Sequence, residues 1–209
     1  MIRRNFDIRS RKTDTMSAVT KYYYPRSLAV IALLGAGLWL ALSETRLVWW
    51  SALLPLFEWM EGTVFGVIGQ TWGAAFATVQ AIHLLGMALL GGSVVVADGR
   101  LLGLLLSDSP ASEVQDQCHR LFVWALFLTV ATGIFMACGV AIKIYYLNVF
   151  WYKMLALSAG VAFVYGIRRP LLRQGLDAIH PRIVKLVAVA SLMLWFTVAA
   201  TGRWIGFSG

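Results

Sequence analysis

Long apolar stretches without charged residues alternate with short polar segments along the chain. Residues 71–97, which belong to the longest charge-free run, contain no Asp, Glu, Lys or Arg. This segment exceeds the roughly 20 residues that a helix needs to cross a hydrocarbon core about 30 Å thick. Similar or somewhat shorter stretches occur on both sides of it. The pattern predicts five membrane-spanning helices, at about 27–43, 71–97, 120–142, 149–167 and 184–201.

Two segments near the start of the chain differ from these spans. Residues 1–26 mix Lys and Arg with polar residues and predict a basic cytoplasmic tail. Residues 47–60 are rich in aromatic side chains and carry a narrow polar stripe, which predicts an interfacial amphipathic helix that Pro55 breaks or kinks. We expect an all-α integral membrane protein in which residues 27–209 form a single transmembrane helical domain. A four-helix core would follow the N-terminal span.

The composition supports a membrane location. The chain is 59% hydrophobic and 13% charged, whereas soluble domains are about 45–50% apolar. Most of the 18 Lys and Arg residues lie on one side of the predicted topology, which places the N terminus in the cytoplasm and the C terminus in the periplasm of a bacterial inner membrane. The net charge of +8 suits anionic lipid headgroups, and no motif indicates nucleic-acid binding.

His83 is the candidate functional residue, because it lies near the middle of the longest apolar stretch. Ionisable side chains at that depth are costly unless they face protein, water or a ligand. Helical spacing places Gln80, His83 and Met87 on one face, together with Asp98, and we expect this face to point inward. Three interpretations stay open: a structural hydrogen bond to a neighbouring helix, a haem or metal ligand, and a proton or quinone site.

The chain offers few partners for His83 as a metal or haem ligand. His119 and His180 lie in polar regions at span ends, so a pair of histidines at matched depth is missing. A Met thioether can ligate haem iron or copper. Met87 could share a copper ion with His83, and Met193 on the last span is a candidate for the opposite ligand of a b-type haem. Lys153, near the outer end of the fourth span, is expected to snorkel outward.

Several short motifs carry a resemblance to a known family. From about Phe57 to Phe207 the chain resembles a family of small bacterial membrane proteins of uncharacterised function, and it is loosely similar to copper-resistance D-type membrane proteins. The resemblance implies a four-helix core with the first span as an added element. That family often has a glutamate three residues before the histidine, where this chain has Gln80. The motifs are Gln80-Ala-Ile-His83-Leu-Leu-Gly86, Asp98-Gly-Arg100-Leu-Leu-Gly103, Thr132-Gly133, Asn148-Val-Phe-Trp-Tyr-Lys153, Leu194-Trp195 and Gly202-Arg203-Trp204-Ile205.

These features favour a membrane subunit of a redox system, with an intramembrane pocket at His83 for haem, copper or quinone. One alternative is a non-catalytic scaffold or accessory subunit, which would pack against other membrane subunits or a second copy of the chain. Another is a small transporter, although the spans carry few polar residues and no inverted repeat. No nucleophile with its base and no paired carboxylates occur within the spans, so we do not expect an enzyme acting alone.

Overall fold

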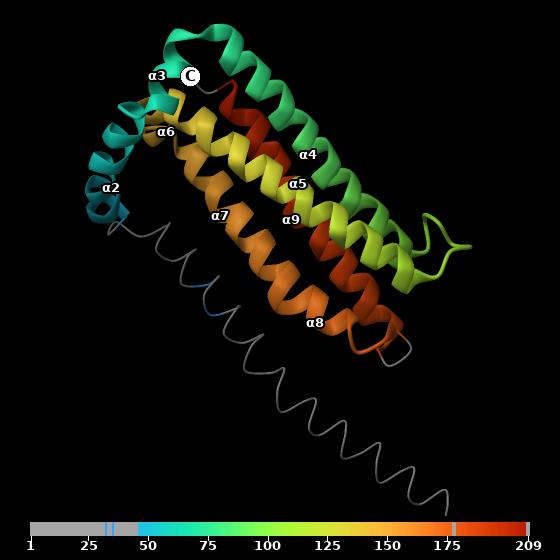
Figure 1. The fold of residues 1–209 in the computed structure, drawn as a ribbon. Helices are drawn as coiled ribbons and strands as arrows, with labels where there is room; N and C mark the ends of the chain where they lie inside the picture. Colours follow the sequence, from blue (N-terminus) through green and yellow to red (C-terminus); the bar gives the residue numbers. More distant parts are fainter. Residues whose placement is uncertain (1–31, 33–34, 36–45, 177–178, 208–209) are drawn as a thin grey trace, which may run out of the picture.

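The computed structural model describes residues 32, 35, 46–176 and 179–207, and this part of the chain is helical without strands (Figure 1). The predicted basic tail and nearly all of the predicted first span lie outside the described residues. The elements are α2 (Arg46–Glu61), α3 (Val64–Thr71), α4 (Gly73–Leu102), α5 (Ala111–Gly139), α6 (Ala141–Tyr145), α7 (Asn148–Phe163), the π-helix η1 (Val164–Arg168), α8 (Arg169–Leu172) and α9 (Pro181–Ile205).

Four described helices are long and apolar enough to cross a membrane. They are α4, α5, α9 and the continuous helix Asn148–Leu172, which joins α7, η1 and α8. In Figure 1 they lie side by side as a bundle, with α4 against α5 and α9, and α7 against α9. The prediction of an all-helical chain with apolar helices able to cross a membrane is confirmed for the described residues. The bent pair α2–α3 would count as a fifth span if it crosses as one unit, and it is not the span predicted at about 27–43.

The bent pair contains the predicted interfacial segment. Helix α2 continues through Pro55, and the chain turns by 69° only between α2 and α3. The Thr63 hydroxyl caps α3 by accepting a hydrogen bond of 3.2 Å from the Gly66 N–H. A capped helix start satisfies N–H groups that have no partner within the helix, so the break lies at Thr63 rather than at the proline.

Two helices begin earlier than the apolar stretches alone indicate. Helix α5 starts at Ala111, so most of the polar segment before residue 120 is helical rather than a connecting loop. Glu113 lies in its first turn, where a negative charge is favourable at the positive end of the helix dipole. Helix α9 starts at Pro181, and the His180 ring accepts a hydrogen bond of 3.2 Å from the Arg182 N–H.

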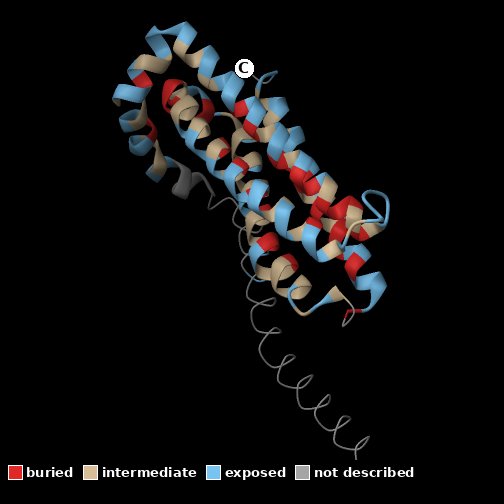
Figure 2. Ribbon diagram, turned by 45° about the vertical axis from the view of Figure 1, so that its right-hand side comes forward, coloured by how far each residue is buried: buried red, intermediate tan, exposed pale blue. Residues whose placement is uncertain are grey.

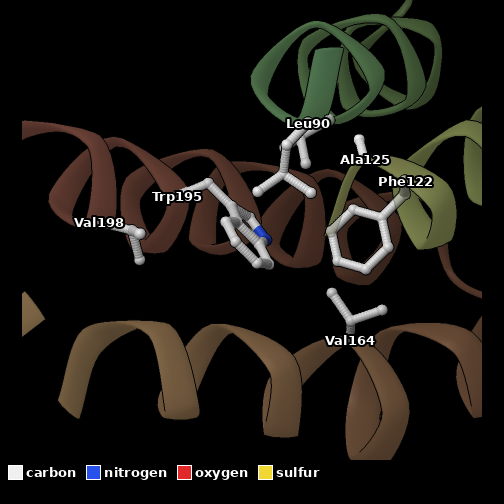
Figure 3. Packing of buried hydrophobic residues seen from close by; sticks show 7 residues of the cluster. Leu90, Phe122, Ala125, Val164, Trp195 and Val198 are labelled. Atoms are coloured by element: carbon white, nitrogen blue, oxygen red, sulfur yellow. The ribbon is translucent and has the colours of Figure 1, made fainter. Parts of the chain in front are cut away.

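The core of the bundle packs around Trp195 on α9. Its ring meets Phe122 of α5 edge-on, with ring centroids 5.2 Å apart. Gly160 of α7 leaves room for it, because a Cβ there would lie 3.2 Å from the indole. Buried residues follow the inner faces of the four helices, and the outward faces are exposed in the isolated chain (Figure 2). The cluster around Trp195 comprises Leu90, Val94, Phe122, Ala125, Val164 and Val198, most of which Figure 3 shows pointing toward one another.

Helix α3 contacts the end of α5 backbone to backbone. A Cβ built on Gly69 would lie 2.8 Å from the Cα of Gly139, and one on Gly139 would lie 3.2 Å from the Cα of Gly69. Real side chains do not approach a backbone atom so closely without displacing it. The glycine pair therefore holds the short helix α3 against the bundle.

We expect Gly69→Ala to destabilise the protein by about 1–3 kcal/mol, because the added methyl group would push α3 and α5 apart. Gly91→Ala in α4 is the matched control, since nothing lies within 4 Å of its Cβ position. The control should be neutral or stabilising by up to about 1 kcal/mol, the usual helix preference of Ala over Gly. Thermal unfolding in detergent, followed by tryptophan fluorescence, measures both, and equal midpoints would contradict the close contact.

Candidate functional site

His83 lies at the contact between α4 and α5, with only 7% of its surface exposed. Its Nδ1 is 2.9 Å from the hydroxyl oxygen of Thr132 on α5. The two helices come close here because glycines face the contact. A Cβ on Gly133 would lie 3.3 Å from the His83 ring, and one on Gly86 would lie 2.8 Å from the Thr129 hydroxyl. The imidazole is thus held in one orientation between the helices.

The hydrogen bonds around Thr132 bear on which nitrogen of the His83 ring carries the proton. The Thr132 hydroxyl donates its single hydrogen to the carbonyl oxygen of Leu128, at 2.7 Å. A hydroxyl engaged in this way accepts from His83, which favours the tautomer with the hydrogen on Nδ1. In a neutral imidazole this leaves Nε2 with a free lone pair. No side chain in the described part of the protein hydrogen-bonds to Nε2.

A cation from a third helix faces this region. Lys153 of α7 is half-buried and lies against Gly202 of α9, where a Cβ would be 3.4 Å from the lysine Cε. The lysine is close enough to His83 to act on it electrostatically. Among the described residues no carboxylate pairs with Lys153. We group His83 and Lys153 as a base and a cation that act on each other electrostatically, and call them the His83 site.

Of the other candidate residues predicted with His83, one lies partly inside the bundle and two are exposed. Met87 is half-buried one turn further along α4, on the face that carries His83. Gln80 is exposed, and Met193 of α9 is exposed over 67% of its surface, so neither lies inside the bundle. His119 is 13 residues from Thr132 along α5, a separation of about 20 Å. No group of three His, Cys, Asp or Glu side chains suited to a metal ion occurs among the described residues.

A second polar cluster lies at the opposite end of α4. Asp98 is fully buried, and Arg168 of the π-helix η1 donates two hydrogen bonds to its Oδ1, from Nε at 3.0 Å and from the terminal nitrogen Nη2 at 2.7 Å. This is the one ion pair within 4.0 Å in the described part of the chain. We call the end of the bundle where α4 ends and α9 begins the Asp98 end.

Gln115 of α5 joins the ion pair to a third helix. Its side-chain oxygen accepts a hydrogen bond of 2.8 Å from Arg168, and its amide nitrogen donates to the carbonyl oxygen of Ala97 at 2.6 Å. The buried Ser191 hydroxyl of α9 lies beside the Asp98 carboxylate, but without the geometry of a hydrogen bond. The Asp98 Oδ2 atom is likewise buried without a hydrogen-bond partner among the described residues. The network therefore links three helices. Two of its oxygen atoms, on Asp98 and Ser191, have no hydrogen-bond partner among the described residues.

The sequence pattern did not reveal this ion pair. Asp98 was expected on the inward face, but its nearest basic residue along the chain, Arg100, donates instead to the Ser109 carbonyl at 2.9 Å. In the sequence, Arg168 directly follows the predicted span 149–167 and is expected to begin a basic loop. In the structure, the helix Asn148–Leu172 continues through Arg168 with a π-helical turn, and Arg168 is buried. π-Helical turns are rare and frequently lie at functional sites, and nothing in a hydrophobic pattern signals them.

Comparison with known families places the chain. The model of a family of unknown function, DUF6644, matches residues 56–208, so the chain belongs to this family. The expected resemblance to an uncharacterised family is thereby confirmed, whereas no link to copper-resistance D-type proteins is found. No curated protein and no solved structure matches the chain significantly.

We expect Arg168→Gln to destabilise the protein by about 3–5 kcal/mol, because it leaves the Asp98 carboxylate buried without its cation. Adding Asp98→Asn to Arg168→Gln should restore part of this loss. Arg182→Gln, at an exposed position of α9, should change the stability by no more than about 0.5 kcal/mol. Unfolding in detergent measures the double-mutant cycle, and strict additivity of the two single changes would contradict a direct interaction.

Proposed function

We propose that this DUF6644 protein is a membrane subunit of a redox system and that the His83 site binds a quinol. The proposal is supported by the buried His83 ring, whose Nδ1 lies 2.9 Å from the Thr132 hydroxyl. We infer that Nε2 is unprotonated and accepts a hydrogen bond from the ligand. A quinol hydroxyl is a hydrogen-bond donor, and it matches this acceptor. An oxidised quinone offers only carbonyl oxygens, so the site should prefer the reduced form. Quinols dissolve in the bilayer and reach such a site from the membrane.

Lys153 supplies the second half of the proposed chemistry. When the quinol hydroxyl passes its proton to Nε2, negative charge develops on the quinol oxygen. A cation in a medium of low dielectric constant stabilises that charge strongly. Thr132 keeps its hydrogen bond to Nδ1 throughout, so the ring does not turn. The described residues would supply a first proton acceptor and a cation for the quinol, whereas the acceptor of the electrons would have to come from a partner subunit. We therefore infer a subunit rather than a complete enzyme.

The exposed position of Gln80 on α4 supports the presence of a partner subunit. Gln80 lies one turn before His83 and is exposed although it belongs to an apolar span. An amide facing lipid has no hydrogen-bonding partner, which makes its exposure costly unless another helix covers it. We therefore infer that the partner packs against the Gln80 side of α4, close to the proposed quinol. The bacterial inner membrane, with the N terminus in the cytoplasm, is the proposed location.

A metal centre at His83 is the second candidate. The same Nε2 lone pair could bind copper or a haem iron, and the half-buried Met87 places a soft thioether one turn away. Two donors from one helix suit a copper ion more readily than a haem, whose axial ligands must lie on opposite faces of the ring. Met193 points away from the bundle interior, so a haem would need a ligand from a partner chain.

Binding of a quinol and of its oxidised quinone, measured by quenching of tryptophan fluorescence in detergent, tests the proposal. We expect the quinol to bind more tightly than the quinone. His83→Ala should weaken quinol binding by about tenfold or more, the loss of one hydrogen bond to a group that becomes charged. Lys153→Met should weaken it as well. His119→Gln is the matched control, and it should leave binding unchanged.

The alternatives give different results in the same preparation. A Soret band, or stoichiometric copper that disappears in Met87→Leu, would support the metal centre instead. Thr132→Val removes the acceptor of the Nδ1 hydrogen while keeping the size of the side chain, so it should weaken quinol binding without unfolding the protein. Failure of the purified protein to bind quinol, haem or copper would overturn both candidates and leave the accessory subunit as the better account.

A further inference from the structure

A cavity of about 600 Å³ lies at the Asp98 end of the bundle, between α5 and the end of the helix Asn148–Leu172. This volume is typical of small-molecule sites. Its polar wall is formed by Ser112, Gln115, Asp116, His119, Arg168, Arg169 and Arg173. The cavity is separate from the His83 site, which lies about 20 Å away along α5. It therefore calls for its own explanation.

Positive charge dominates this cavity. Arg168 forms its inner wall and is neutralised by Asp98. Arg169 and Arg173 have no carboxylate within 4.0 Å among the residues that the structure describes. Arg173 comes four positions after Arg169, a spacing that places both side chains on the same side of a helical turn. Asp116 is the one acidic side chain in the described wall. An anion would balance the excess charge.

The histidine in the wall points to the same conclusion. The His119 ring is held by aromatic contacts, with centroids 6.2 Å from Phe122 and 6.0 Å from Tyr165. Arg168, Arg169 and Arg173 line the same cavity as His119 and act on it electrostatically. Arginine forks bind phosphate oxygens through paired hydrogen bonds, and a histidine N–H can add another.

The remaining wall is apolar. Leu172 and Leu176 line the cavity and belong to a hydrophobic cluster with the buried Ile179. The membrane-spanning helix ends at Leu172, so the arginines lie at the level where a span meets the headgroups. We propose that this cavity binds a phosphate group, presented either by an anionic phospholipid headgroup or by a soluble phosphate ester, with Arg169, Arg173 and His119 as its ligands.

Native mass spectrometry of the full chain, released from detergent after addition of phosphatidylglycerol, tests this proposal. Phosphatidylcholine serves as the lipid control, and inorganic phosphate and glycerol 3-phosphate form the soluble arm. We compare the wild type with the double variant Arg169→Gln/Arg173→Gln. The charge-matched control is Arg182→Gln/Lys185→Gln, which removes two exposed cations from the same end of the bundle but outside this cavity.

We expect one phosphatidylglycerol per chain, bound at least about tenfold more weakly by Arg169→Gln/Arg173→Gln and less than about twofold more weakly by the control. Saturable binding of glycerol 3-phosphate with the same dependence on the two arginines, without lipid binding, would assign the site to a soluble phosphate ester. Equal weakening by both double variants would show attraction to surface charge in general and overturn the proposal. Absence of binding by every phosphate probe, with thermal unfolding of the wild type intact, would overturn it too.

Discussion

The buried ion pair between Asp98 and Arg168 is the constraint on which the rest of the bundle depends. A carboxylate and a guanidinium group inside an apolar bundle are tolerated only when they meet each other and additional hydrogen-bond partners. Here the pair links α4 to the π-helix η1, and Gln115 extends the link to α5. Apolar contacts between Leu and Val side chains are not directional, whereas the hydrogen bonds of the ion pair form only at one relative position of the helices. The pair thus sets the register of three helices.

That register decides what the opposite end of α4 can do. Asp98 and His83 lie on the same face of α4, about 22 Å apart along the helix, and both point into the bundle. Fixing Asp98 against α5 and the π-helix is compatible with the position of His83 against Thr132, where Lys153 acts on it electrostatically. The two ends then differ in chemistry. One holds a buried histidine hydrogen-bonded to a threonine, and the other gathers arginines around an open cavity.

The sequence predicted the features that hydrophobic patterning controls. The helical class, the four described spans and the inward position of His83 follow from long apolar stretches and helical spacing. Patterning could not predict that the polar residues near Gln115 are helical, because they contact α4 rather than solvent. It could not pair Asp98 with Arg168, since the partners lie 70 positions apart and one of them sits in a π-helix. Gln80 kept the right helical spacing, yet it is exposed.

The protonation of His83 is the claim on which the proposed function depends, and nitrogen-15 NMR of the protein in lipid bilayers measures it directly. A variant with His119→Gln and His180→Gln leaves His83 as the single histidine, so that its two ring signals can be assigned without ambiguity. We expect a protonated Nδ1 and an unprotonated Nε2, with the Nε2 signal shifting when a quinol is added. A proton on Nε2 in the ligand-free protein would contradict this expectation.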